Sequence, residues 1–192
     1  MAVVNSIEMS KEEICNLMNS ESYRDFTANI LDTFTDNGLT YKVSKTKRIY
    51  CYIKKSKEAL IINPNSYSDG EYSIQLRIKN AETFAKLESL TENVRNQILF
   101  NSGNCKMPGC WGCNTEYVFE YAGSEYRKCS MLCDNFHFSK LEKDDFKCIL
   151  AMIKDEIIFG KPKKRGGKNN GQDKKRTANG RYGNRFKKNF GG

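Results

Sequence analysis

The chain has 192 residues, a formal net charge of +9 at pH 7 and 39% hydrophobic residues. This length suits one globular domain with an appendage; no run approaches the roughly 18 apolar residues of a membrane span, and the first residues lack the basic and apolar blocks of a secretory signal. We therefore expect a cytoplasmic protein with reduced cysteines, and clustered thiols in that compartment more often hold metal than form disulfides.

The charge is divided very unevenly along the chain. Residues 161–192 contain twelve Lys and Arg against one acid, a net of +11, whereas residues 1–160 contain twenty basic and twenty-two acidic side chains, a net of −2. The first segment is long enough to bury a core. The second has no apolar run that could offset the entropy of ordering it. The composition predicts a folded domain over 1–160 and a disordered basic tail over 161–192.

The first predicted element is helical. Ser10 and Glu13 form a capping-box pattern, in which the serine oxygen accepts from a free amide and the glutamate reaches back. Apolar residues then recur at helical spacing as far as Phe34, as one helix or as two helices broken near residues 19–22. The pattern ends at Asn37–Gly38, where glycine can adopt the left-handed cap.

Four strand-like segments follow, rich in β-branched and aromatic residues. They cover residues 40–44, 48–54, 58–64 and 71–79. In the last segment apolar and polar residues alternate strictly, which predicts one covered and one solvated face, as in an antiparallel sheet. The apolar set is Tyr72, Ile74, Leu76 and Ile78, and the polar set is Ser73, Gln75, Arg77 and Lys79. We expect three or four antiparallel strands that pack against the preceding helix.

Two short helices and a hairpin are predicted next. Asn80 and Thr91 are typical helix caps, and the second helix should run to about Phe100. Ala122–Ser124 is a plausible hairpin turn. The strands that flank it are predicted at residues 115–121 and 125–129.

The last predicted element of the domain is a helix that Ser139 to Glu142 would begin with a second capping box. Its buried stripe comprises Phe146, Ile149, Leu150, Ile153 and Ile157. Gly160 and Pro162 should end it. The fold class predicted for residues 1–160 is therefore α+β, an antiparallel sheet with amino-terminal and carboxy-terminal helices and a late zinc-ribbon-like cysteine hairpin.

Five of the eight cysteines fall within a module at about residues 104–138. Cys110 and Cys113 form a Cys-x-x-Cys turn, and Cys129 and Cys133 follow at nearly the separation of a zinc ribbon. The second pair is one residue too wide, because four extended residues cover roughly 13 Å whereas thiolates on one zinc lie within about 4 Å of each other. Either the chain turns after Cys129 or one of that pair does not ligate, and Cys105 is the natural substitute.

We predict a structural zinc site with Cys110 and Cys113 as ligands and two more from Cys105, Cys129 and Cys133. A hairpin that pairs Tyr121 with Glu125 would place Cys113 opposite Cys133, and a shifted register would favour Cys129. The alternatives are a redox pair or buried thiols. A redox pair is disfavoured because the motif precedes a strand rather than a helix. A site with four sulfur ligands leaves no coordination position for catalysis.

Two other residues of the module have structural interpretations. His137 is the one histidine of the chain and alternates with aromatic residues like a strand residue, which favours a structural role over metal ligation. Trp111 lies within the cysteine turn, where a ring that covers the metal is favoured over a ring exposed to a partner. The remaining cysteines, Cys15, Cys51 and Cys148, fall in apolar stripes or strands and are predicted to be small buried side chains.

The run "CKMPGCWGC…YVFEYAGSEYRKC…FHF…DDF" resembles a group of small, poorly characterised bacterial proteins of the low-GC Gram-positive type. Those proteins carry a cysteine-rich hairpin before a final helix, and the resemblance covers roughly residues 72–158. It implies a metal-binding protein of the cytoplasm with no established activity. The basic tail departs from that pattern.

The tail mixes basic residues with glycine, asparagine and spaced aromatics, and it resembles the basic glycine-rich tails of RNA helicases and ribosome-associated proteins. Cations release counterions from phosphates, and planar side chains stack on unpaired bases, which favours RNA over duplex DNA. The residues predicted to bind are Lys163, Lys164, Arg165, Lys174, Lys175, Arg176, Arg181, Tyr182, Arg185, Phe186, Lys187 and Lys188. The alternatives are a solubilising charge run and, less favoured, a membrane-surface anchor.

We do not predict an enzyme. The chain has no nucleotide-binding glycine motif, no nucleophile elbow and no zinc-deaminase pattern, and Asp144–Asp145 is explained by the dipole of a helix start. The sequence thus favours a zinc-stapled accessory protein that binds nucleic acid, RNA in particular. The alternative is a protein-interaction or regulatory module with a structural metal, in which the body binds a partner and the tail only localises the protein.

Overall fold

The computed structural model describes residues 6–54, 57–65, 71–101, 116–129 and 135–160. These residues form an α+β fold, as predicted. In chain order the elements are β1 (Ser6–Ile7), α1 (Lys11–Cys15), α2 (Glu21–Asp36), β2 (Thr40–Ser44), β3 (Ile49–Lys54), β4 (Lys57–Asn63), β5 (Ser73–Arg77), α3 (Glu82–Ala85), α4 (Glu92–Asn96), β6 (Glu116–Tyr121), β7 (Ser124–Cys129), β8 (Asn135–Ser139) and α5 (Lys143–Gly160). A 3₁₀ turn at Leu87–Ser89 precedes α4, and a π-helical turn at Gln97–Asn101 follows it.

The main sheet is antiparallel throughout and has the strand order β1-β2-β3-β4-β5-β8. It is therefore larger than the three or four strands expected from the sequence. β8 pairs with β5 across a long chain excursion, with Ile74 opposite Phe138 and Leu76 opposite Phe136. No local pattern indicates such a pairing, because it joins segments that are far apart in the sequence.

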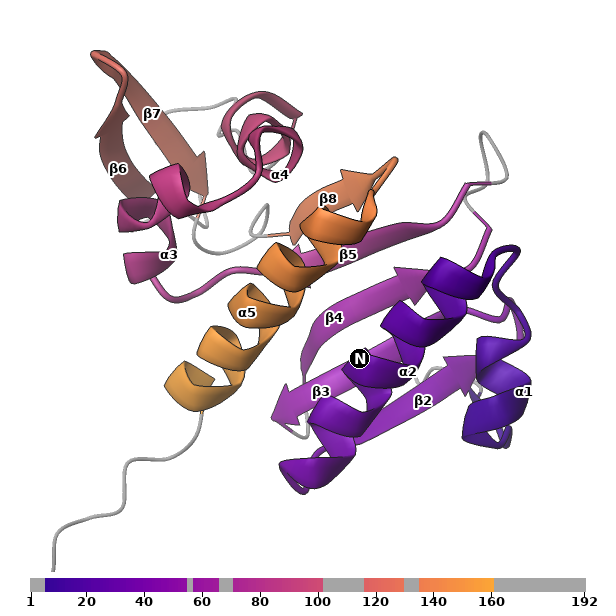
Figure 1. Cartoon of the computed structure of the whole chain (residues 1–192). Coiled ribbons are helices and arrows are strands. Elements are labelled where there is room, and N and C mark those ends of the chain that lie inside the picture. The colour runs from indigo at the N-terminus through magenta and orange to yellow at the C-terminus, as the bar shows by residue number, and fades with distance from the viewer. Residues whose placement is uncertain (1–5, 55–56, 66–70, 102–115, 130–134, 161–192) are drawn as a thin grey trace, which may run out of the picture. The chain divides into compact units, whose positions relative to one another are not determined.

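The long helices α2 and α5 lie on the same side of the main sheet, in front of its strands in Figure 1. The apolar stripe of α2 is fully buried there through Phe26, Ile30 and Phe34. The two helices meet through the rings of Phe26 and Phe146, which stack with their centroids 4.3 Å apart. Each such buried large side chain contributes about 2–3 kcal/mol through the hydrophobic effect.

The beginning of the chain follows its predicted helix signals. Both hydrogen bonds of the Ser10–Glu13 capping box are present. The helix is broken into two, as one of the alternatives allowed, because Ser20 caps α2 by accepting the backbone N–H of Tyr23. Gly38 follows α2 with a φ of +69°, the left-handed conformation that glycine adopts without strain.

The predicted start of the final helix is wrong by several residues. Ser139 is the last residue of β8, and α5 begins only at Lys143. Asp145 supplies the cap instead, because its carboxylate accepts the backbone N–H of Glu142 at 2.9 Å. Asp145 also accepts from Thr91 and from the Asn93 side chain (2.6 Å), so the buried acid joins the starts of α4 and α5.

The predicted solvated face of β5 is only partly correct. Its apolar set is buried, as expected, but Ser73 and Arg77 on the opposite face are only 1% and 9% exposed. β5 is an interior strand between β4 and β8, so its side chains are flanked on both sides. The Arg77 guanidinium forms an ion pair with Glu58 of β4 at 3.3 Å.

Candidate metal site at the β6–β7 hairpin

The predicted hairpin is present as a separate two-stranded sheet, β6–β7. Its loop consists of Ala122 and Gly123, with φ values of +48° and +75°. This is a two-residue turn with both residues in the left-handed region, and its twist matches that of the strands. Tyr121 pairs with Ser124, so the predicted pairing of Tyr121 with Glu125 is wrong by one residue. Ser124 belongs to the returning strand and not to the loop.

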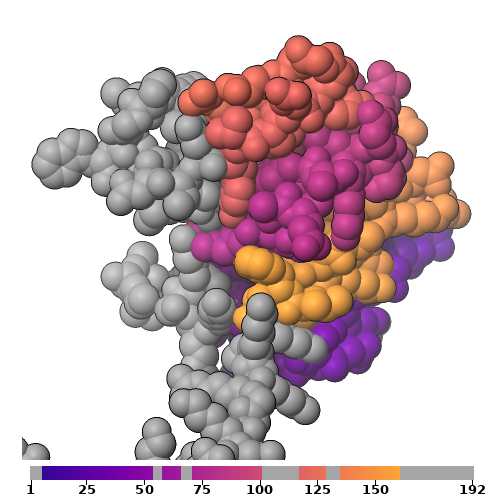
Figure 2. Space-filling model, turned by 90° about the vertical axis from the view of Figure 1, so that its left-hand side faces the viewer, coloured from indigo at the N-terminus to yellow at the C-terminus, as the bar shows by residue number. Residues whose placement is uncertain are grey.

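The hairpin is attached to the rest of the fold by a row of aromatic rings. Phe119 of β6 stacks on Phe84 of α3 with centroids 4.8 Å apart, and on Tyr126 of β7 at 5.7 Å. Phe84 in turn contacts Phe136 of β8 at 5.8 Å. In the space-filling view the hairpin lies directly against the segment that carries α3 and α4 (Figure 2). One face of β6–β7 is thereby fixed relative to the main sheet.

Lys128 is a buried cation on this aromatic face of the hairpin. Its side chain is 0% exposed, and its ammonium donates to the carbonyl oxygen of Leu99 at 2.8 Å. Leu99 belongs to the π-helical turn after α4. Desolvation lowers the pKa of Lys128 to about 8. A desolvated positive charge favours anionic groups nearby, thiolates among them.

Lys128 was missed by the sequence analysis, although a signal was available. In the two strands the aromatic residues occupy alternate positions, and Lys128 falls in the same alternation as Tyr126. In the hairpin register it lies opposite Tyr117. Extending the alternation across the hairpin would have assigned this lysine to the packed face.

The predicted metal ligands are only partly within the described residues. Cys129 is the last residue of β7 and pairs with Glu116 at the open end of the hairpin. The other candidates, Cys105, Cys110, Cys113 and Cys133, lie outside the described residues, as does Trp111. Among the described residues, no group of three or more His, Cys, Asp or Glu side chains could hold a metal ion.

The cysteines assigned to packing are free thiols, as expected. Cys51 is fully buried in β3, and burial raises the pKa of its thiol. Cys15 and Cys148 are half-buried in α1 and α5. His137 is half-buried in β8 opposite Gln75, and desolvation lowers its pKa.

All the tail residues predicted to bind nucleic acid lie outside the described residues, because residues 161–192 are not among them. Within the part of the chain that is described, none of the helices has the length and apolar character needed to cross a membrane. No protein-family model, curated protein or solved structure matches this chain. The function is therefore inferred from the residues and their arrangement.

Proposed function

We propose that this protein is a zinc-stapled nucleic-acid-binding accessory protein, with RNA as its ligand. The observation that supports the zinc site best is the register of the hairpin, in which Glu116 pairs with Cys129 at the open end. The two cysteine-bearing segments are the continuations of these paired residues. Their attachment points on the hairpin are therefore adjacent.

Chain length limits how far the thiols can separate. Cys113 precedes Glu116 by three positions, and Cys133 follows Cys129 by four. An extended residue spans at most about 3.5 Å, so Cys113 lies within about 11 Å of Glu116 and Cys133 within about 14 Å of Cys129. Paired antiparallel residues are about 5 Å apart. This tether permits Cys113 and Cys133 to reach one ion.

The register also bears on the choice among the ligands. The hairpin is shifted by one residue from the pairing that favoured Cys133, and such a shift favours Cys129, which we propose as the third ligand after Cys110 and Cys113. Cys133 and Cys105 compete for the fourth position. A zinc ion with four thiolates carries a net charge of −2, and the buried ammonium of Lys128, next in sequence to Cys129, offsets part of it.

The metal is tested by native mass spectrometry of the purified chain before and after a strong chelator. One zinc per chain is expected, and it should be lost on chelation. Cys110→Ser and Cys113→Ser should abolish zinc binding, whereas Cys51→Ser, at the buried thiol in β3, should retain it. A chain that binds no zinc, or a Cys51→Ser effect equal to that of Cys113→Ser, would contradict the site. Cys105→Ser and Cys133→Ser identify the fourth ligand.

The nucleic-acid function is supported by the charge distribution of the chain. Residues 161–192 carry a net of +11 with interleaved aromatics, on a domain with a net of −2. A segment that neutralises six to ten phosphates loses roughly 10³–10⁵ in affinity between 50 and 200 mM salt for duplex DNA, and somewhat less for single strands. The zinc site would stabilise the domain from which the tail extends.

The RNA interaction is tested by fluorescence anisotropy of the full chain with a labelled single-stranded RNA over that salt range. We expect a steep fall of affinity with salt, and a large loss at constant salt when the lysines and arginines of residues 163–188 are replaced by glutamine. A flat salt response would refute nucleic-acid binding by the tail.

Protein interaction is the second candidate function, and exposed apolar side chains favour it. Ile158 and Phe159 at the end of α5 are 70% and 57% exposed. Exposed apolar groups of this size are common at protein interfaces. A protein that co-purifies with the chain, survives neutralisation of the tail and is lost on Ile158→Ser and Phe159→Ser substitution would support this function over RNA binding.

A further inference from the structure

The face of the main sheet opposite α2 and α5 carries two tyrosines on one strand. In β3, Ile49 and Cys51 are buried on the helix-covered face, and Tyr50 and Tyr52 alternate with them. Both tyrosines are half-buried. Within the described residues neither phenol hydroxyl makes a hydrogen bond. Their Cα atoms are roughly 7 Å apart along the strand, a spacing that accommodates two successive bases that are not stacked on each other.

The register extends this face into a row of side chains that are polar except for Ile61. Across adjacent strands the row runs Lys42, Tyr50, Ile61, Gln75 and His137. It combines a cation, an aromatic ring, an amide and an imidazole, the groups that contact the faces and edges of unpaired bases.

The charge of the strands favours an anionic ligand. β2, β3, β4, β5 and β8 contain one acid, Glu58, and its carboxylate is paired with Arg77. Lys42 lies opposite Tyr50 in the register and is exposed. Within the described residues Lys42 makes no ion pair. An acidic protein segment would pair with the cations but would not stack on the two adjacent tyrosine rings. A nucleic-acid strand contacts both, the cations through its phosphates and the rings through its bases.

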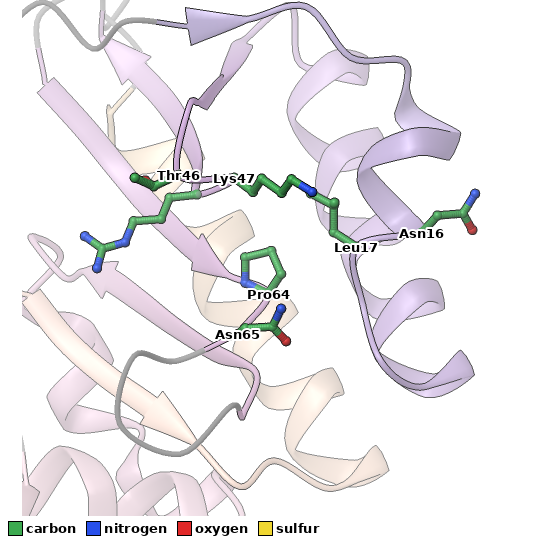
Figure 3. Close-up of a pocket in the computed structure, with 7 residues that line it drawn as sticks. Asn16, Leu17, Thr46, Lys47, Pro64 and Asn65 are labelled. Atoms are coloured by element: carbon green, nitrogen blue, oxygen red, sulfur yellow. The ribbon is translucent and has the colours of Figure 1, made fainter.

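A groove lies at the turn between β2 and β3, and it is also lined by Asn16 and Leu17 at the end of α1 and by Pro64 after β4. It has a volume of about 530 Å³, and its lining includes Thr46, Lys47, Arg48 and Asn65. No acidic side chain of the described residues lines it. Figure 3 shows the Lys47 side chain extending from the turn toward Leu17, with Pro64 and Asn65 at the end of β4.

The turn that presents these cations is held rigidly. The Lys47 N–H donates to the Ser44 carbonyl at 2.8 Å, and the Ser44 N–H donates to the Arg48 carbonyl at 2.9 Å. The Ser44 hydroxyl oxygen also accepts the Arg48 N–H at 3.1 Å. Lys47 has a φ of +59°, a left-handed conformation that a non-glycine residue adopts where the surroundings enforce it. The backbone that carries these two cations is thus held in place before a ligand binds.

We infer that the β2–β3 part of this face is a second contact for a single nucleic-acid strand. Tyr50 and Tyr52 stack on two bases, and Lys42, Lys47 and Arg48 bind the neighbouring phosphates. The inference rests on the proposed RNA function and adds a site on the folded domain to the one in the tail. Stacking on tyrosine reads no particular base, so the contact is sequence-tolerant.

The stacking is tested with the full chain and a labelled uridine dodecamer at about 100 mM salt. Each stacked base is worth about 1–3 kcal/mol, so Tyr50→Ala with Tyr52→Ala should weaken binding at least tenfold. The matched variant Tyr50→Phe with Tyr52→Phe should bind as the wild type does. A dodecamer without bases should bind the alanine and wild-type chains equally.

The phosphate contacts are tested by the salt dependence of the same binding. Lys42→Gln with Lys47→Gln should lower the slope of log affinity against log salt by about 1.4, since each phosphate contact on a single strand contributes about 0.7. Lys86→Gln with Lys154→Gln removes the same charge from an exposed turn position, where Lys86 is paired with Asp155, and from an exposed position of α5, and it should leave the slope nearly unchanged.

The outcomes separate this inference from the function on which it rests. If the wild type binds RNA and the alanine variant binds equally well, the sheet contact is refuted and the tail function survives. If the wild type binds no RNA, both are refuted. A 4-thiouridine dodecamer cross-linked to the wild type provides a check that needs no variant. Cross-links should map to residues 49–54, and cross-links confined to residues 161–192 would overturn the inference.

Discussion

Glu156 is a buried acid that fixes the chain where it leaves the main sheet. Its Oε1 atom accepts the backbone N–H groups of Lys79 and Asn80 at 3.0 and 2.8 Å, just after β5. Burial raises the pKa of this carboxyl, and the two hydrogen bonds only partly oppose the increase. A group with a raised pKa in the folded state stabilises the fold most below its unfolded pKa and loses this contribution as the pH rises through the folded value.

Glu156→Gln should therefore change the pH dependence of stability. The amide keeps an acceptor for both N–H groups but does not titrate. The unfolding free energy of the wild type minus that of the variant should fall as the pH rises from about 4 to 7, where the carboxyl ionises. Urea unfolding over this range measures it. The exposed Glu8→Gln serves as control, and parallel curves for wild type and Glu156→Gln would contradict the assignment.

Ala122 carries strain in the hairpin turn, since its φ of +48° is unfavourable for a residue with a side chain. The left-handed conformation costs such a residue about 1–2 kcal/mol, and asparagine tolerates it best. Ala122→Asn should therefore stabilise the protein by about 0.5–1 kcal/mol in chemical unfolding. Ala122→Val should have the opposite sign, because a β-branched side chain fits this conformation poorly. Equal effects of the two substitutions would exclude the turn geometry described above.

At the residue scale the features that could be predicted from the sequence are helix caps, which depend on residues close by in the chain. Ser10, Gly38 and Thr91 were recognised as caps because their partners lie within three or four positions. Asp145 was placed correctly in the first turn of the last helix, but its bonds to Thr91 and Asn93 were not foreseen. Those bonds come from another helix. Distant partners leave no trace in a local pattern.

At the scale of elements the β6–β7 hairpin depends on one ring of a short helix. Phe84 in α3 is 6% exposed and contacts rings of both β6 and β8. A helix of this length has little stability of its own. The attachment of the hairpin therefore comes from packing and not from the backbone of α3.

Phe84→Ala should destabilise the protein by about 3–4 kcal/mol, the usual cost of removing a buried phenylalanine. Amide exchange in β6 and β7 should accelerate more than in β3 and β4. Phe159→Ala is the matched control, because Phe159 at the end of α5 is 57% exposed and its loss should cost under about 1 kcal/mol. Uniform acceleration of exchange across both sheets would argue against a separately attached hairpin.

The strands themselves were largely predictable, but not all of their neighbours. β2 to β7 were expected within a residue or two of their observed bounds, because strand composition and turn residues are local signals. The predicted hairpin register was wrong by one residue, because alanine is not a residue type that indicates a positive φ. The β5–β8 pairing could not be predicted, since no local pattern determines whether β8 pairs with β5 or with the opposite edge strand, β1. Of the five predicted metal ligands, the described residues include Cys129, at the open end of the hairpin.

At the scale of the whole molecule the main sheet is completed by its latest strand. Residues 1–77 supply five of its six strands in sequence order, and β8 joins only after the excursion of residues 78–134. This excursion contains the hairpin and all five clustered cysteines, with Cys133 close to its end. The sheet thus cannot close until the chain has been brought back to β5.

With the proposed zinc site, that strand order would make assembly sensitive to the metal supply. Bringing β8 back to β5 closes a loop of more than fifty residues, and the entropy of this loop is lost before the β5–β8 hydrogen bonds can offset it. If a bound ion shortens the loop, refolding from urea should be slower and less complete with a chelator than with stoichiometric zinc. Stopped-flow fluorescence of Trp111 and the tyrosines measures this, with Cys113→Ser as the control that should not respond to zinc. Equal rates for the wild type in both conditions would contradict it.

Until it is paired with β8, the edge of β5 is a row of open backbone groups able to bond with another molecule's strand. If the proposed zinc site forms, a newly made chain deprived of zinc would keep this edge unpaired for longer, and chaperones and aggregation would affect its yield as much as its own stability. Abundance of the mature protein would then track the cell's zinc status, with no change in its message or its ligand.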